Sequence, residues 1–421
     1  MPVIDVPEKI QKVMEIMEKS GYETCAVGGC VRDSLLGKPI HDWDLCTSAE
    51  PDETEMVFAQ AGVHTIPTGK KHGTITVLWN REPIEITTYR IDGKYTDSRR
   101  PDSVTFTRTL KEDLSRRDFT INAMACGRDG KVIDLFDGQK DLEKHNIRCV
   151  GVPQMRFEED ALRILRALRF AARLGFRLEE NTARAVMEDK DRLALIAPER
   201  IWAELTGFLA GKYAAPIVKD FYPVLAASLN LEQPYQKDGW IAMADSLALP
   251  MPESWTDLMF VTARFSLMLW KGAFAGCPDA GEKARDCCIA LRTDKDTRNR
   301  VALLVGQAEQ PIPQTVPQLR RMTGDFGMDA VGQLIFMWEA AGTAETSEIL
   351  RLREHADAIL QRGDCVRIGQ LAVSGKDLQK LGVSPGPEVG RILHALLDEV
   401  INDNLPNEKD ALENWICQKL K

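Results

Sequence analysis

Two hydrophobic periods alternate along the first 150 residues. Apolar residues at helical spacing, bounded by proline, acidic residues or glycine, predict short helices at 7–20, 31–37 and 51–62. Segments rich in β-branched and aromatic residues predict strands at 23–27, 41–47, 72–80 and 82–90, the last two joined as a hairpin around Arg81 and Glu82. Helices and strands mixed in this way predict an α+β domain.

The strand pattern disappears after residue 150. Between 158 and 176 apolar residues recur at helical spacing, with arginines between them. The helical pattern continues to residue 421 and is broken by a proline-rich segment at 309–318, which we expect to be a linker. The sequence therefore predicts an α+β head followed by a long all-α continuation.

Composition narrows the class of protein. The chain has 421 residues, 44% of them hydrophobic, and contains neither a membrane-length apolar run nor a signal peptide, so we expect a cytoplasmic protein. Its ten cysteines are scattered, which favours reduced thiols. The net charge of −9 argues weakly against nucleic acid as a partner. However, 156–177 holds six arginines and three acids, and local charge governs binding.

Two aspartates one residue apart, Asp42 and Asp44, stand in the predicted strand 41–47. Alternate residues of a strand face the same way, so the two carboxylates would repel each other unless a cation lay between them. We therefore expect Mg²⁺ at this pair, with Glu85 on a later strand as a third carboxylate. Taken alone, such a pair is more often a solvated strand end, and Glu85 is as readily a solvent-facing residue.

A glycine pair, Gly28 and Gly29, follows the first predicted strand and precedes a helix. Glycine lets the backbone approach an anion, and a helix start offers free N–H groups, so the segment predicts a phosphate site to which Arg32 adds charge. Further along, Arg117 is suited to phosphate and Asp118 to a ribose hydroxyl; the alternative is a charged surface cluster that caps a helix. A phosphate cradle beside a carboxylate pair predicts nucleotidyl transfer.

Five motifs follow one another along the chain in this order: "GGCVRD", "DWDLCT", "RRDFTINAMA", "FEEDALRILRALRFAARLGF" and "APERIWAEL". Together they resemble the class II tRNA nucleotidyltransferases, that is the CCA-adding enzymes, and the related bacterial poly(A) polymerases. The resemblance implies template-independent addition of C, C and A to tRNA from CTP and ATP. It also implies a polymerase-β-like head with a mixed sheet, then helical neck, body and tail domains, with expected bounds 1–150, 151–215, 216–318 and 319–421.

The same resemblance assigns recognition of the base to Asp160 and Arg163, and further nucleotide contacts to Arg166 and Arg169. On a helix Asp160 and Arg163 would share a face, one accepting and the other donating hydrogen bonds. Cytosine and adenine each present an amino donor beside a ring-nitrogen acceptor, whereas uracil and guanine reverse both groups. One Asp–Arg pair therefore suits C and A alone. The alternative is an ordinary salt bridge on a solvated helix.

Several rival activities remain open. The polar segment 92–107 resembles the loop that full CCA-adding and A-adding enzymes possess and CC-adding enzymes lack, while "TGKKHGTITV" (68–77) resembles the CCA-adding form rather than a poly(A) polymerase. An inactive RNA-binding protein would be expected to lose a metal carboxylate. A small-molecule nucleotidyltransferase would need neither a base reader nor the tail, whose segment 371–407 resembles a tRNA-holding tail. The sequence leaves the oligomeric state open.

Overall fold

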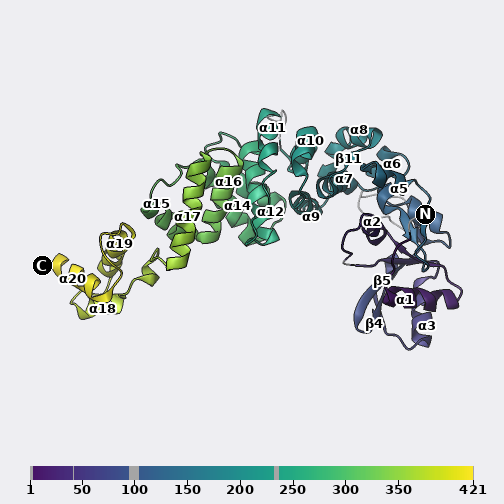
Figure 1. Cartoon of the computed structure of the whole chain (residues 1–421), viewed down its shortest axis with the longest axis horizontal. Coiled ribbons are helices and arrows are strands. Elements are labelled where there is room, and N and C mark those ends of the chain that lie inside the picture. Colours follow the sequence, from purple (N-terminus) through teal and green to yellow (C-terminus); the bar gives the residue numbers. More distant parts are fainter. Residues whose placement is uncertain (1–2, 41, 94–103, 232–236, 421) are drawn as a thin grey trace. The chain divides into compact units, whose positions relative to one another are not determined.

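The computed structural model describes residues 3–40, 42–93, 104–231 and 237–420. The chain forms two compact units, Met1–Tyr235 and Gln236–Lys421. Their helices and strands are labelled in Figure 1. No described helix is both long enough and apolar enough to cross a membrane.

The first unit is built on a mixed sheet, as expected. In the described part of this unit the sheet has seven strands, of which only β2 and β5 run parallel. Helices α1 (Glu8–Lys19), α2 (Gly29–Leu35) and α3 (Pro51–Gln60) confirm the predicted helices. In spatial order the strands are β3 (Thr65–Gly69), β4 (Thr74–Trp79), β5 (Glu82–Thr88), β2 (Leu45–Thr47), β1 (Thr24–Val27), β8 (Met124–Cys126) and β9 (Val132–Asp134).

Two details of the strand prediction were wrong. The strand expected at 41–47 begins only at Leu45, so Asp42 and Asp44 lie in the chain segment just before β2. Its partner β1 ends at Val27, because Gly28 adopts a positive φ of 81° and turns the chain away. The hairpin of β4 and β5 turns at Asn80 and Arg81, one residue earlier than expected, and both have positive φ. Strands β3, β8 and β9 were not predicted.

Helices follow the sheet within the same unit. Their bounds are α6 (Pro153–Glu159), α7 (Leu162–Leu174), α8 (Glu180–Glu188), α9 (Pro198–Leu209) and α10 (Ala214–Ser228). One short parallel strand pair, β10 (Asn146–Ile147) with β11 (Arg177–Leu178), interrupts the helical pattern and was not predicted. Because α10 spans the expected neck–body boundary and packs on α7 and α9, the four-domain division stays a prediction.

The second unit is helical, as expected. Trp270 and Trp338 are buried in it, and the Trp338 indole donates to the Ala308 carbonyl. Residues 309–315 of the proline-rich segment form the loop between α14 (Lys295–Ala308) and α15 (Val316–Phe326), and its last three residues begin α15. The remaining helices are α11 (Lys237–Ser246), α12 (Asp257–Leu267), α13 (Ala280–Ala290), α16 (Met328–Ala340), α17 (Thr346–Arg362), α18 (Gly375–Lys380), α19 (Pro387–Ile401) and α20 (Lys409–Lys419). The last three share a small apolar core.

Candidate active site

The predicted carboxylates meet at one end of the parallel pair β2–β5. Leu45 pairs with Ile86 in this register, so the preceding residues, Asp44 and Glu85, are neighbours across the two strands. Asp42, Asp44 and Glu85 all line one cleft of about 420 Å³. Among the described residues, no three His, Cys, Asp or Glu side chains converge tightly enough to enclose a metal ion by themselves.

Asp44 occupies an electrostatically costly position. Although much of its surface faces solvent, the atoms packed around the carboxylate withdraw water from it and raise its pKa, and the negative charge of Asp42 adds to this effect. The positive charge of Arg117 opposes the rise in pKa. The carboxylates of Asp42 and Asp44 thus repel each other. A cation bound beside them would offset this repulsion.

The glycine pair gives Arg117 its place. With φ at 81°, Gly28 adopts a conformation that side chains rarely tolerate, and a Cβ there would lie 3.0 Å from a terminal nitrogen of Arg117. Gly29 begins α2 and lines a second cleft of about 490 Å³, which also contains Arg32, Asp42, Asp44 and Arg169. The aspartate pair therefore borders two clefts, one of them rich in arginine.

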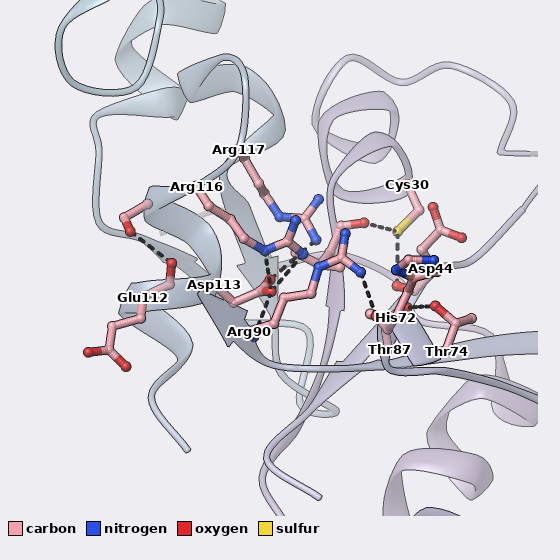
Figure 2. A network of polar contacts seen from close by, with 12 residues as sticks. Cys30, Asp44, His72, Thr74, Thr87, Arg90, Glu112, Asp113, Arg116 and Arg117 are labelled. Atoms are coloured by element: carbon pink, nitrogen blue, oxygen red, sulfur yellow. Dashed lines mark hydrogen bonds and ion pairs between the residues drawn. The ribbon is translucent and has the colours of Figure 1, made fainter. Parts of the chain in front are cut away.

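A buried carboxylate orders the arginines behind this site. Asp113 is 1% exposed and accepts bonds of 3.0 and 2.8 Å from Nε and a terminal nitrogen of Arg116. It also accepts a 3.5 Å bond from Arg117 and one from the Arg90 backbone. Figure 2 shows this network together with Asp44 and Cys30. Asp113 thus links the start of β6 (Arg90–Asp92) to the arginine beside Asp44.

Arg32 bridges the head to α7. It donates to Asn122 Oδ1 at 2.7 Å, and its other donors form a bidentate pair with Asp33 at 2.9 and 2.8 Å. Its guanidinium also lies 5.1 Å from the centre of the Phe170 ring. Arg166 and Arg169 lie 5.4 and 4.9 Å from the centre of the same ring, so three cations from two elements surround one aromatic side chain.

Asp118 is engaged by α7 as well. Its Oδ2 accepts a 2.8 Å bond from Arg166, and its Oδ1 accepts from Asn122 at 3.2 Å. Burial alone would raise the pKa of Asp118, but Arg166, Asn122 and Arg163 outweigh burial and lower it. The ion pair between Asp118 and Arg166, which is largely shielded from water, thus joins the head to α7.

On α9, Glu204 pairs with two of the arginines of α7. Its carboxylate lies 3.0 Å from Arg169 and 3.6 Å from Arg166. Burial raises the pKa of Glu204, whereas the two arginines act to lower it. Gly207, one turn later, leaves room for Arg169, because a Cβ there would lie 2.6 Å from Arg169 Cδ. Helix α9 therefore fixes the side chains that α7 presents.

Asp160 and Arg163 do not share a helix face as expected. Asp160 ends α6 in an extended conformation (φ −145°, ψ 101°), and α7 starts only at Leu162. The side chain causes the break, since Asp160 Oδ1 accepts from the Leu162 backbone at 3.1 Å and competes with helical bonding. Its Oδ2 accepts a 2.7 Å bond from Arg200.

Arg163 is buried and has separate partners. It donates to Glu159 at 2.6 Å, to the Arg156 carbonyl at 3.2 Å and to the Arg116 carbonyl at 3.0 Å. A guanidinium has five N–H donors. Within the described part of the chain, these bonds therefore leave two donors for a ligand. The salt bridge between Asp160 and Arg163 that was considered as an alternative does not form.

Sequence reasoning missed five residues that hold the predicted ones: Asp113, Asn122, Phe170, Arg200 and Glu204. Four of them lie inside the motifs "RRDFTINAMA", "FEEDALRILRALRFAARLGF" and "APERIWAEL", namely Asn122, Phe170, Arg200 and Glu204. For Phe170, Arg200 and Glu204 the available signal was a charged or aromatic residue inside a segment of helical pattern. Asn122 and Asp113 had no such signal.

A mixed sheet whose end carries a carboxylate pair, bordered by an arginine-rich cleft and followed by helices, defines a nucleotidyltransferase. Three family models match the chain: Poly A polymerase head domain at 24–148, a probable RNA- and SrmB-binding site of polymerase A at 175–222, and a putative tRNA nucleotidyltransferase domain 2 at 272–416.

A CCA-adding enzyme of Lactobacillus delbrueckii subsp. bulgaricus is 36% identical over 99% of this chain and 98% of its own length. One from Lactiplantibacillus plantarum is 38% identical over 95% and 93%. The chain belongs to the CCA-adding enzymes. Among solved structures, the Bacillus stearothermophilus CCA-adding enzyme in complex with CTP is 28% identical with a TM-score of 0.72, covering 98% and 97% of the two chains.

Proposed function

We propose that this chain adds C, C and A to the 3′ end of tRNA from CTP and ATP without a nucleic-acid template, and releases pyrophosphate. Its near full-length relatives are CCA-adding enzymes. The observation that carries the proposal is the position of Asp42 and Asp44, which border both an arginine-rich cleft and a cleft that contains Glu85. A tRNA 3′-oxygen would bond to the α-phosphorus, the α–β bridging bond would break, and the hydroxyl proton would be released.

The site residues fit Mg²⁺. Asp42, Asp44 and Glu85 offer only oxygen donors, and burial together with the charge of Asp42 raises the pKa of Asp44, a shift that a bound cation would oppose. Mg²⁺ commonly takes one or two protein carboxylates together with substrate phosphates, so three converging protein ligands are not required. We expect Asp42 and Asp44 to hold the ion, which supplies activation of the attacking hydroxyl and neutralisation of the leaving pyrophosphate.

Four residues are expected to hold the triphosphate: Gly28, Gly29, Arg32 and Arg117. The glycines allow close backbone approach, and Arg117 lies against Gly28 while its charge acts on Asp44. Asp118 keeps its predicted ribose role, because a carboxylate oxygen can accept a further bond beside its bond from Arg166.

Base selection is expected at the α6–α7 junction. Asp160 would accept from the amino group of C or A, and Arg163 would donate to the adjacent ring nitrogen. Arg200 and Glu159 already hold the two side chains, which limits the reorientation that binding requires. Arg166 and Arg169 are expected to contact the nucleotide beside this pair.

The test uses purified protein, Mg²⁺ and tRNA lacking its last three nucleotides, with CTP alone, ATP alone or both. Growth by three nucleotides with both, and by two with CTP alone, is the expected result. A stop after two additions with both nucleotides would indicate a CC-adding enzyme. Addition of a single A to a CC-ended tRNA alone would indicate an A-adding enzyme, and a long A ladder a poly(A) polymerase. No growth on any RNA would leave an inactive RNA-binding protein.

Asp42→Ala should abolish addition of both nucleotides while tRNA binding persists, because the side chain is surface-exposed and its loss removes a metal ligand only. Product length on a sequencing gel and filter binding of tRNA measure the two properties. Asp52→Ala, an exposed aspartate of α3, is the matched control. Retained addition by Asp42→Ala would refute the metal assignment.

A further inference from the structure

The two clefts that meet at the aspartate pair differ sharply in charge. The first holds four cationic side chains, Arg32, Lys38, Arg169 and Arg173, against three carboxylates. The second holds one, Lys9, against the carboxylates of Asp42, Asp44 and Glu85. A triphosphate would be attracted by the first cleft and repelled by the second.

Nucleotidyl transfer needs two substrates at one carboxylate pair. Attacking and leaving oxygens lie roughly in line across the reacting phosphorus, so they approach it from opposite sides. If the pyrophosphate occupies the arginine-rich cleft, the attacking 3′-hydroxyl must come from the other side of Asp42 and Asp44. The second cleft borders that side.

The lining of the second cleft suits a nucleoside at the end of an RNA strand. Half-buried Trp43 lies between the two aspartates and lines the cleft together with Ile10, Pro83 and Ile84. An aromatic face accepts any base by stacking, which a primer site needs because the 3′-terminal base changes at each addition. Lys9 at the exposed edge, paired with Glu82, is a flexible cation of a kind that contacts a backbone phosphate.

We propose that this cleft is the subsite for the 3′-terminal nucleotide of the RNA, with Trp43 stacking on its base and Lys9 contacting its phosphate. The proposal rests on the proposed function, since it names where the second substrate of that reaction binds. Trp43 and Lys9 are positioning residues that present the hydroxyl.

Binding is measured first, without catalysis. The probe is tRNA lacking its last three nucleotides, with 2-aminopurine as its 3′-terminal base, titrated in EDTA. Stacking on Trp43 should quench the fluorescence, and Trp43→Ala should abolish that quenching while Trp43→Phe keeps part of it. Lys9→Ala should weaken binding, whereas Lys12→Ala, an exposed lysine on the same helix paired with Glu8 at 2.7 Å, should not. Equal quenching by wild type and by folded Trp43→Ala overturns the proposal.

Kinetics separate this subsite from the nucleotide site. Trp43→Ala should raise KM for tRNA about tenfold, as expected for one lost stacking contact, and leave KM for CTP within about twofold. An equal rise in both KM values would place Trp43 in the nucleotide site and refute the assignment. If Trp43→Ala fails to fold, Trp43→Phe and Lys9→Ala are measured instead. KM values for tRNA equal to that of the wild type in both of these variants would refute the proposed subsite. Quenching by a wild-type protein that adds no nucleotide would contradict the proposed function alone.

Discussion

At the scale of single residues, the ionised side chain of Asp44 lowers the stability of the folded protein. Because its folded-state pKa is raised, the ionised form is less stable in the folded than in the unfolded protein. That penalty is present above the folded-state pKa and vanishes below the ordinary aspartate range of about 4. The ionised carboxylate thus lowers the stability of the fold, which fits its proposed role as a metal ligand.

Asp44→Asn should therefore raise the melting temperature of the metal-free protein near neutral pH while abolishing nucleotide addition. The difference in melting temperature between Asp44→Asn and the wild type should decrease as the pH falls through the pKa of Asp44. Mg²⁺ should also decrease this difference, because it stabilises the wild type. Thermal unfolding at several pH values, with and without EDTA, measures this. A variant less stable than wild type at neutral pH would contradict the argument.

Arg163→Ala should relax selection against UTP, because a mispaired buried polar group costs about 1–3 kcal/mol and its loss removes that discrimination. The ratio of CTP to UTP incorporation should fall by roughly 5-fold to 150-fold. Arg177→Ala removes an exposed arginine at the end of the arginine-rich segment 156–177 and serves as the control. Unchanged selectivity with normal folding would remove Arg163 from base reading.

At the scale of elements, local pattern predicted the first three helices, the helical character of the chain after residue 150 and the β4–β5 hairpin. The prediction from local pattern failed where a side chain or a neighbouring strand determines where an element begins or ends. Asp160 breaks one helical pattern into α6 and α7 by bonding to the backbone, and β2 is shortened because β1 turns away at Gly28. The carboxylates and arginines of the site were identifiable by residue type, but Glu204 and Asp113 hold them through contacts distant in sequence. The predicted loop at 92–107 lies largely outside the described residues.

The turn from β1 to α2 gives an element-level prediction. Gly28→Ala should destabilise the protein by about 1–2 kcal/mol for its positive φ, with an added cost for displacing Arg117. Gly29→Ala is the matched control for stability, because Gly29 is helical and its new Cβ would lie 3.8 Å from a terminal nitrogen of Arg32, an ordinary van der Waals contact. Denaturant unfolding compares the two. Equal stability would show that Arg117 does not depend on this turn.

At the scale of the molecule, each unit is held by a few buried charges between distant segments. In the second unit, Arg320 on α15 is 8% exposed and bonds Asp364 at 2.8 Å, Asp403 at 2.7 Å and the Ile401 carbonyl at 2.9 Å. These partners follow α17 and close α19, so one guanidinium joins three helices. Arg320 is therefore a buried link between α15 and the segments that follow α17 and α19.

Arg320→Gln should lower the free energy of unfolding by about 3 kcal/mol, because removing one partner of a buried pair leaves the others uncompensated. Arg321→Gln, which loses an exposed pair with Asp398, should cost at most about 1 kcal/mol. Hydrogen exchange should accelerate in α18–α20 for Arg320→Gln alone. Similar effects of the two substitutions would show that the buried position contributes nothing.

The Phe170 ring has a consequence for how such an enzyme can change over generations. It lies beside Arg32, which is expected to bind phosphate, and beside Arg166 and Arg169, which are expected to contact the nucleotide. A substitution of Phe170 would alter affinity for every nucleotide and choice among nucleotides in the same step. A lineage acquiring a new nucleotide preference is thus expected to keep this ring and to vary the residues around it.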